Sequence, residues 1–226
     1  MKWIDSFNGA LQDSWRHGDR SWVMPRYEAN CGAYAFLWAC AFTLGAKHKR
    51  WRGVLKRFYF LSRSTAFTGM EPERLVSEFE ATSLLTYKPN HLSLIEKWKW
   101  LQRQLCQGRP VVLCIERPFK VKKEGSCRFL DWHLVTACGY DRDAIYVIDP
   151  APLADCDVAL PIPLRKIMKD RLLKTSVAAN VYVSNPDYVK AKTRRVKIDG
   201  KPMCLADKAR FRVWASDGWA VSVAAP

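Results

Sequence analysis

Three residues of this chain, Cys31, His133 and Asp149, have the types and the order of a catalytic triad built on a thiol. A thiol becomes a nucleophile when a helix N-terminus or a neighbouring base favours its ionised form. A histidine can take the thiol proton, and a carboxylate can hold the histidine ring in the required orientation. Such a triad attacks a carbonyl or carboxamide carbon and passes through a covalent acyl-enzyme.

Cys31 opens a run of small, apolar and aromatic residues, CGAYAFLWACAFTL, that stops just before Gly45. Glycine directly after such a run is typical of a helix C-terminus, and a helix that is apolar on all sides is a buried one. The sequence therefore predicts a buried helix over residues 31–44. Cys31 stands in its first turn, where the helix dipole favours a thiolate, whereas Cys40 is predicted to be a core residue.

His133 is the histidine whose neighbours would hold its ring rigidly, because the other three histidines lie in polar or charged segments. It begins the run HLVTACGY (133–140), and AIYVID (144–149) follows after the letters DRD. An Asp-rich turn between two such runs predicts a β-hairpin. His133 and Asp149 are equally distant from residue 141, so we expect the hairpin to place them side by side.

Each of the three residues also has an ordinary structural explanation. A free cysteine in an apolar helix is commonly packed as a small hydrophobe. A histidine at the start of a strand is commonly packed and hydrogen-bonded, and aspartate before proline is common in turns. The catalytic interpretation depends on the combination of the three residues on a helix and two adjacent strands.

Three short blocks match a known family: Asn30-Cys31-Gly32, Pro110-Val111-Val112, and the H-x-V…GYD…V-x-DP pattern from His133 to Pro150. On these blocks, residues 25 to 150 resemble the papain-like cysteine peptidases. Within them, the chain is most similar to the bacteriocin-processing (double-glycine-leader) peptidases. The resemblance implies a papain-like fold, catalysis by Cys31, His133 and Asp149, and no metal or organic cofactor.

One position departs from the family pattern. Members usually carry a glutamine six residues before the nucleophile, where its side chain helps to form the oxyanion hole, but Pro25 stands at that position here. The backbone amide of Cys31 can supply one donor, and Asn30 and Gln12 are candidates for the second. Three explanations are open: another group donates to the oxyanion in place of the glutamine, the chemistry has moved away from peptide hydrolysis, or the site has low catalytic activity.

The remaining pattern predicts an α+β fold, with helices first and an antiparallel sheet after them. In that fold the N-terminal helices, including the buried nucleophile helix, pack on the sheet. Residues 1–187 are predicted to form the thiol hydrolase domain. Residues 188–226 are predicted to form a basic β appendage with hairpins at Asp199-Gly200 and Asp217-Gly218. The other expected helices cover residues 71–81 and 91–107, and the other expected strands cover 111–116 and 180–184.

The charge and the cysteines limit the partners and the compartment. The formal net charge is +15, and residues 165–226 hold 14 Lys and Arg against 5 Asp and Glu. A basic surface favours nucleic acid, an anionic membrane or an acidic protein partner, but an ordinary solvated surface that keeps the protein soluble has the same composition. No two of the eight cysteines are spaced as C-x-x-C, so a zinc site is not indicated.

We expect no transmembrane segment and no cleaved signal peptide. The protein would then be cytoplasmic as made, with export by a signal-independent route left open.

The leading hypothesis is therefore a cysteine peptidase-like thiol hydrolase that acts on a protein or peptide substrate. Deamidation, transamidation and isopeptide cleavage use the same triad and remain open. The alternative is a catalytically drifted domain of the same fold, either a deamidase or transamidase or a non-enzymatic binding protein. A binding protein would act through its basic surface, including the segment KHKRWRGVLKRFYF. A basic thiol hydrolase without a signal is also compatible with a bacterial effector or toxin.

Overall fold

The computed structural model of the 226-residue chain describes residues 2–3, 31–45, 48–65, 70–120, 128–149, 164–174, 177–183, 194–198, 201–211 and 213–226. Its helices are α2 (Cys31–Leu44), α3 (Trp51–Ser64), α4 (Pro72–Ala81), α5 (Leu94–Cys106), α6 (Lys169–Leu172) and α7 (Ala215–Gly218). Its strands are β1 (Lys2–Trp3), β2 (Leu85–Tyr87), β3 (Val111–Lys120), β4 (Arg128–Tyr140), β5 (Ala144–Ile148), β6 (Leu164–Met168), β7 (Val177–Val183), β8 (Arg194–Ile198), β9 (Lys201–Phe211) and β10 (Ala220–Ala224).

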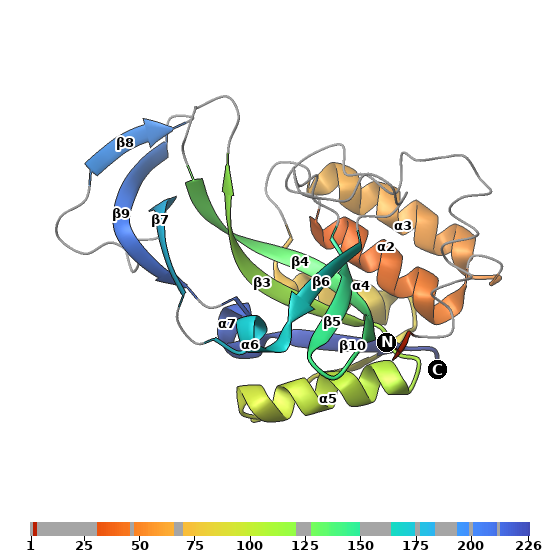
Figure 1. Cartoon of the computed structure of the whole chain (residues 1–226). Coiled ribbons are helices and arrows are strands. Elements are labelled where there is room, and N and C mark those ends of the chain that lie inside the picture. The colour runs from red at the N-terminus through yellow and green to blue at the C-terminus, as the bar shows by residue number, and fades with distance from the viewer. Residues whose placement is uncertain are drawn as a thin grey trace.

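The strands form one branched sheet, mostly antiparallel, which confirms the expected α+β class. Its main path runs β2-β10-β3-β4-β7-β9-β8, and β5, β6 and β1 join it through β4. The thirteen-residue β4 can serve both branches because its first part pairs with β7 and its last part pairs with β5. Figure 1 shows helices α2, α3 and α4 on one side of the molecule and β7, β8 and β9 at the opposite end.

Helix α2 has the bounds that the sequence predicts, and it is buried on all sides from Gly32 to Phe42. It ends at Gly45, whose φ of 74° is in the left-handed region that favours glycine. The amide of Gly45 donates to the carbonyl of Ala41 at 2.9 Å and so closes the last turn. The Thr136 hydroxyl donates to the Ala35 carbonyl at 3.3 Å, which ties α2 to β4.

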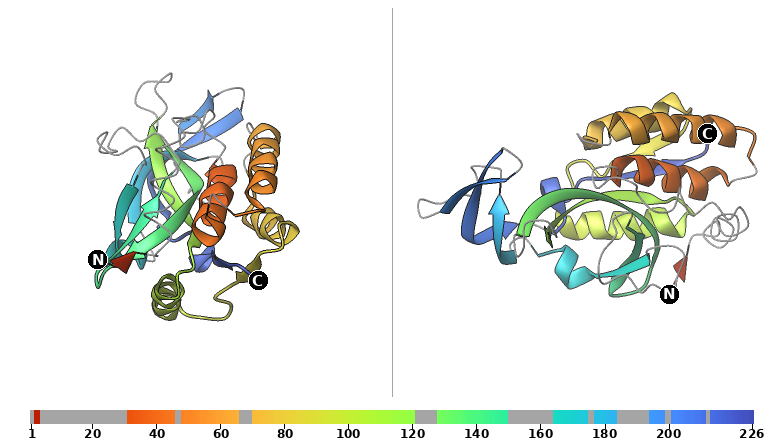
Figure 2. Two further views of the ribbon diagram at one scale, coloured as in Figure 1. Left: turned by 90° about the vertical axis from the view of Figure 1, so that its right-hand side faces the viewer. Right: turned by 90° about the horizontal axis from the view of Figure 1, so that it is seen from above.

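Aromatic contacts fix α2 against the two helices that cover it. Tyr34 meets Phe58 of α3 edge-on, with ring centroids 5.1 Å apart, and Phe36 stacks on Phe79 of α4 at 5.4 Å. Both arrangements are favoured ring geometries. The two views in Figure 2, one from the side and one from above, agree that α2 lies between the strands and α3. The helix that begins at Cys31 is thus held between a sheet and a second helical layer.

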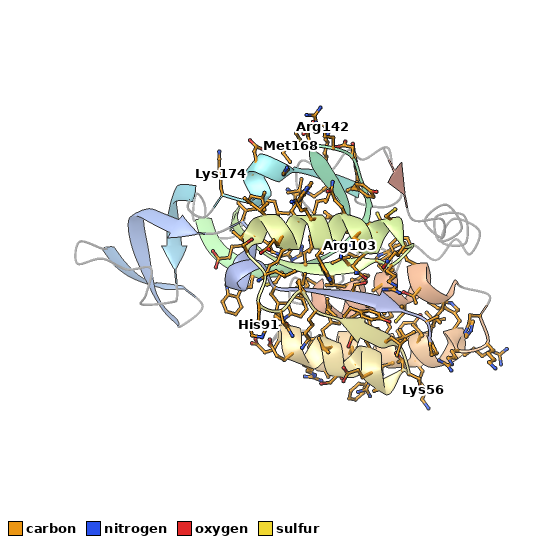
Figure 3. All side chains as sticks on the ribbon, turned by 90° about the horizontal axis from the view of Figure 1, so that it is seen from below. Lys56, His91, Arg103, Arg142, Met168 and Lys174 are labelled. Atoms are coloured by element: carbon orange, nitrogen blue, oxygen red, sulfur yellow. The ribbon has the colours of Figure 1, made fainter. Side chains whose placement is uncertain are left out.

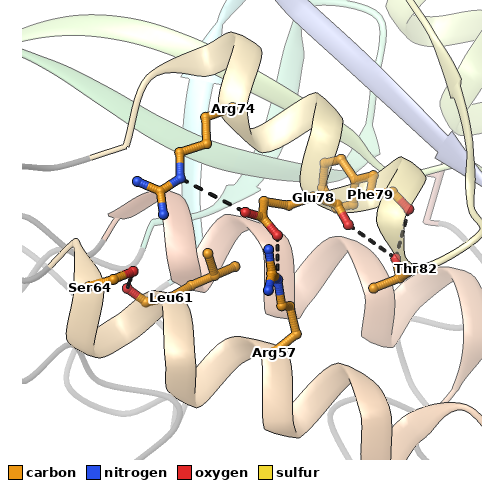
Figure 4. Close-up of polar contacts among 7 residues, drawn as sticks. All are labelled: Arg57, Leu61, Ser64, Arg74, Glu78, Phe79 and Thr82. Carbon is orange, nitrogen blue, oxygen red and sulfur yellow. Dashed lines mark hydrogen bonds and ion pairs between the residues drawn. The ribbon is translucent and has the colours of Figure 1, made fainter.

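A buried carboxylate links the covering helices to one another. Glu78 of α4 accepts from the Arg57 guanidinium of α3 at 2.5 Å and lies 3.8 Å from Arg74 (Figure 4). A buried charge needs such partners. Helix α3, which lies in the basic segment, is amphipathic. Its Val54, Phe58 and Leu61 are buried, and its charged face points outward.

The other two predicted helices are confirmed with small differences at their starts. Helix α4 begins with Pro72 at its first position, as expected from the proline and acidic residues there. Helix α5 begins three residues later than predicted. His91 has a φ of 59°, and a reciprocal capping box between Ser93 and Glu96 sets the helix start instead.

The C-terminal part corrects one predicted hairpin. Strands β8 and β9 pair across the expected Asp199-Gly200 turn, with Ile198 opposite Lys201. The hairpin predicted at Asp217-Gly218 is wrong, because these residues end the short helix α7. Strand β10 then inserts between β3 and β2, where its Val221 and Val223 are fully buried.

The expected boundary between residues 187 and 188 stays a prediction, although β10 crosses it to pair with strands of the N-terminal part. Within the described ranges, no helix has both the length and the apolar character needed to span a bilayer.

Candidate active site

Cys31 is the first residue of α2 and its side chain is half-buried. The amides of a first helical turn have no partners within the helix, so this end of α2 favours a negatively charged sulfur. Gly32 has a packing role beside it, since a Cβ on Gly32 would lie 2.5 Å from the Cβ of Met70. The Cys-Gly pair therefore lets Met70 approach the helix start.

His133 and Asp149 are the other two predicted residues, and they contact one another. His133 lies in β4 and is buried, and Asp149 directly follows β5 and is fully buried. His133 Nε2 is 2.5 Å from Asp149 Oδ1, within hydrogen-bond distance.

The hairpin that joins these two residues has a different register from the predicted one. Thr136 pairs with Ile148, so the same register would place Asp149 opposite Val135 rather than His133. His133 and Asp149 are thus diagonal neighbours on one face, and a long side chain can bridge that spacing. The difference arises because the turn is closed by Asp141 and Ala144, so that Tyr140 pairs with Ile145. The register shift between Ala137 and Gly139 reverses only one residue of that offset.

The Cys31 thiol is a second hydrogen-bond partner of His133. Because Nε2 faces Asp149, Nδ1 is the ring nitrogen that can receive the thiol proton. The structure thus brings the three predicted residues together, from a helix start, a strand and the end of the next strand. Their catalytic role stays a prediction.

The surroundings of His133 favour its protonated form. Burial is the largest single influence on its pKa and lowers it. The charge of Asp149 and the hydrogen bonds with Asp149 and Cys31 act in the other direction, and the pKa of His133 is raised above its usual value. An imidazolium at this position would stabilise a thiolate on Cys31.

Sequence reasoning missed a fourth residue at this site, Arg165 of β6. Its Nη1 donates to Asp149 Oδ2 at 2.5 Å, and about one third of its side chain is exposed. Strand β6 was not predicted at all. The sequence feature that could have indicated this strand is the alternation in LRKIM. In the structure, Arg165 and Ile167 are more buried than Lys166 and Met168.

The other described thiols lack these surroundings. Burial raises the pKa of Cys40 and of Cys138 well above the ordinary thiol value. Cys114 is also buried, and Cys106 is exposed on α5. Among the cysteines whose side chains the structure describes, Cys31 is therefore the one that combines partial exposure with a histidine partner.

Three residues bear on the oxyanion hole, and all lie outside the described residues: Gln12, Pro25 and Asn30. In the described part of the chain, no group of three or more His, Cys, Asp and Glu side chains could hold a metal ion.

A basic and aromatic surface lies on the outer face of α3, opposite the face that packs on α2. Tyr59 and Phe60 are each about half exposed there, and Lys56 points away from the body of the molecule (Figure 3). A hollow of about 710 Å³ is lined, among the described residues, by Lys56, Tyr59, Phe60, Arg63 and Ser64.

No protein-family model matches the chain, and no curated protein matches it. A solved structure that resembles it is a protein from Bacillus anthracis proposed to be a C39-like peptidase. The two chains are 12% identical and superpose with a TM-score of 0.34. The likeness covers 70% of this chain and 60% of the other. A TM-score below 0.5 does not establish a shared fold.

Proposed function

We propose that the chain is a thiol hydrolase of the cysteine peptidase type, with Cys31 as nucleophile, His133 as general base and acid, and Asp149 as the residue that orients His133. The observation that carries the proposal is the continuous hydrogen-bonded series from the Cys31 thiol through His133 to Asp149 Oδ1. It joins three groups in the order that nucleophilic catalysis requires.

The reaction begins with transfer of the Cys31 proton to His133, and the sulfur then attacks the carbonyl carbon of the substrate. The tetrahedral intermediate collapses when the imidazolium gives its proton to the leaving amine, and a thioester remains on Cys31. His133 next takes a proton from water, and the resulting hydroxide attacks the thioester carbon. Collapse of this second intermediate releases the acid and returns the proton to Cys31.

The developing oxyanion needs hydrogen-bond donors, and the backbone amide of Cys31 is positioned to be one of them because it opens α2. The proposed architecture is papain-like, since a buried nucleophile helix packs against β4, and β4 and β5 carry the other two members of the triad.

Peptide-bond hydrolysis is the leading reaction, with deamidation and transamidation as variants in which the same thioester forms from a carboxamide. A role as a bacterial effector or toxin and a cytoplasmic or exported location stay predictions.

A peptide library analysed by mass spectrometry tests the reaction class. Wild type is incubated with the library beside Cys31→Ala and, as a matched control, Cys106→Ala, which removes an exposed thiol outside the site. We expect new peptide termini, or conversion of carboxamides to acids, with wild type and Cys106→Ala but not with Cys31→Ala. Activity that survives in Cys31→Ala would refute the proposal, and the product type separates peptidase from deamidase.

The α3 surface supports a second candidate, a drifted papain-like domain that binds a polyanion such as nucleic acid or an acidic protein. Exposed Tyr59 and Phe60 beside Lys56 and Arg63 combine stacking faces with positive charge. Single-stranded oligonucleotides would then bind more weakly as salt rises. Lys56→Glu with Arg63→Glu should remove this binding. An absence of binding at low salt would exclude nucleic acid as the partner.

A further inference from the structure

Two different strands, β4 and β6, supply the side chains that contact Asp149. Asp149 is fully buried, and each of its oxygens has its own partner, His133 for Oδ1 and Arg165 for Oδ2. A buried carboxylate is costly unless it is paired and hydrogen-bonded. The bond to His133 satisfies one oxygen and leaves the other to Arg165.

The register of the sheet brings both partners to Asp149 in the same way. On one side, β4 presents His133 two residues away from the position opposite Asp149. On the other side, β6 pairs with β5 so that Val147 lies opposite Arg165, again two residues from Asp149 along the strand. Because residues two apart share a face, both side chains reach Asp149 from the same face of the sheet.

Arg165 is also an unusual residue for its place. In β6 it shares the inward face with the buried Ile167, whereas Lys166 and Met168 point outward. An inward charge near a sheet edge can serve to discourage pairing with another chain. That role alone would not require contact with a residue of the catalytic site.

We propose that Arg165 is a positioning residue, whose guanidinium holds Oδ2 of Asp149 so that Oδ1 stays directed at His133. This inference deepens the proposed function and rests on it for the catalytic role of His133. The coupling between Arg165 and His133 through Asp149 can be measured whether or not the protein has catalytic activity.

The charges of the site explain what the arginine contributes besides orientation. The ionisable groups in contact are Cys31 from α2, His133 from β4, Asp149 after β5 and Arg165 from β6. With Arg165 present, these four side chains have no net charge in either form of the site. In one form Cys31 is a thiol and His133 is neutral, and in the other Cys31 is a thiolate and His133 is protonated. Without it, one negative charge is uncompensated in both forms. Loss of the cation makes protonation of its neighbours easier, so the titrations of His133 and Cys31 should both move to higher pH.

Two variants separate charge from orientation. Arg165→Gln removes the charge, and Arg165→Lys keeps the charge but loses the planar guanidinium. Lys166→Gln is the matched control, because it removes a positive charge from the neighbouring outward residue, whose acidic partner is Asp141 rather than Asp149.

Two readouts are followed in each protein. The first is the pH titration of the His133 ring by nuclear magnetic resonance, with its signal identified by its absence in His133→Asn. The second is the rate at which iodoacetamide alkylates Cys31, measured by peptide mapping as a function of pH.

Arg165→Gln should move both titrations to higher pH. It should slow Cys31 alkylation near neutral pH about tenfold, which corresponds to an upward shift of about one unit in the thiol titration. Arg165→Lys should leave the His133 titration near that of wild type and slow the alkylation. Lys166→Gln should change neither readout.

An unchanged His133 titration in folded Arg165→Gln would overturn the inference, whatever Cys31 does. If Arg165→Gln lacks a cooperative thermal transition, Arg165→Lys decides, and unchanged alkylation in that variant would overturn the positioning role. If wild-type Cys31 has ordinary reactivity but Arg165→Gln still shifts His133, the proposed function fails while the coupling stands.

Discussion

Cys31 is set apart from the other described thiols by its surroundings and not by its chemistry. Cys40 lies in the same helix, yet it is fully buried among apolar side chains, and that burial raises its pKa. Cys31 stands at the helix start and contacts His133. Nine residues along one helix therefore separate a packing thiol from a candidate nucleophile.

The raised pKa of His133 predicts how its contribution to stability depends on pH. A group whose pKa is higher in the folded than in the unfolded state stabilises the fold through its protonated form. That contribution is complete below the unfolded value of about 6.5 and is lost as pH rises through the folded value. The difference in free energy of unfolding between wild type and His133→Gln should therefore be largest in mild acid and shrink above neutrality. Urea denaturation at several pH values measures it, and a difference that grows with pH would contradict the raised pKa.

Asp149→Asn tests the orienting role of the carboxylate. An amide can donate to His133 and so favour the wrong ring tautomer, and it cannot stabilise an imidazolium. We expect hydrolysis of a library substrate to fall by at least about two orders of magnitude in kcat, with little change in KM. Asp143→Asn, in the exposed hairpin turn, is the control. Similar kcat values for Asp149→Asn and wild type would remove Asp149 from the mechanism.

At the scale of elements, the site depends on how the start of α2 packs. Gly32→Ala would force its new Cβ against Met70. We expect a loss of about 1–3 kcal/mol in the free energy of unfolding, as is typical of overpacking. Gly53→Ala is the opposite control, because a Cβ there meets nothing within 4 Å in the exposed part of α3. It should gain about 0.5–1 kcal/mol from helix propensity. Urea denaturation compares the two, and equal effects would show that the Met70 contact does not constrain the helix start.

The elements that the sequence predicted well are those with a strong local pattern. Helix α2 is apolar on every side, and the β4–β5 hairpin has apolar runs on both sides of an Asp-rich turn. Strand β6 was missed because five residues with two charges give little signal. Arg165 was missed with it, since its meeting with Asp149 depends on the register of β5 against β6. Local pattern does not encode that register.

At the scale of the whole molecule, the last strand belongs to the centre of the sheet. Strand β10 pairs with β3 on one side and β2 on the other. Its sequence alone indicates a strand but not its partners, which is why a terminal hairpin was predicted. Pairings between distant segments are decided by the total burial of the fold, and Trp214, Val221 and Val223 are all fully buried.

This placement predicts that the C-terminal strand is essential to the fold. Val221→Asp would bury an unpaired charge in the sheet and should cost about 4 kcal/mol or more. Ala225→Asp, four residues later and exposed, should change stability by no more than about 0.5 kcal/mol. Thermal unfolding followed by circular dichroism compares them, and a mild effect of Val221→Asp would place β10 outside the core.

The most direct test of the central claim compares two thiols within one molecule. Iodoacetamide labelling with peptide mapping gives the alkylation rates of Cys31 and of the exposed Cys106 from pH 5 to 10 in wild type and His133→Ala, a range that brackets the free-thiol value of about 8.5. We predict that wild-type Cys31 is alkylated at a clearly lower pH than Cys106, and that His133→Ala removes the difference. If Cys31 becomes reactive only at the pH where Cys106 does, and His133→Ala changes nothing, the catalytic account is contradicted.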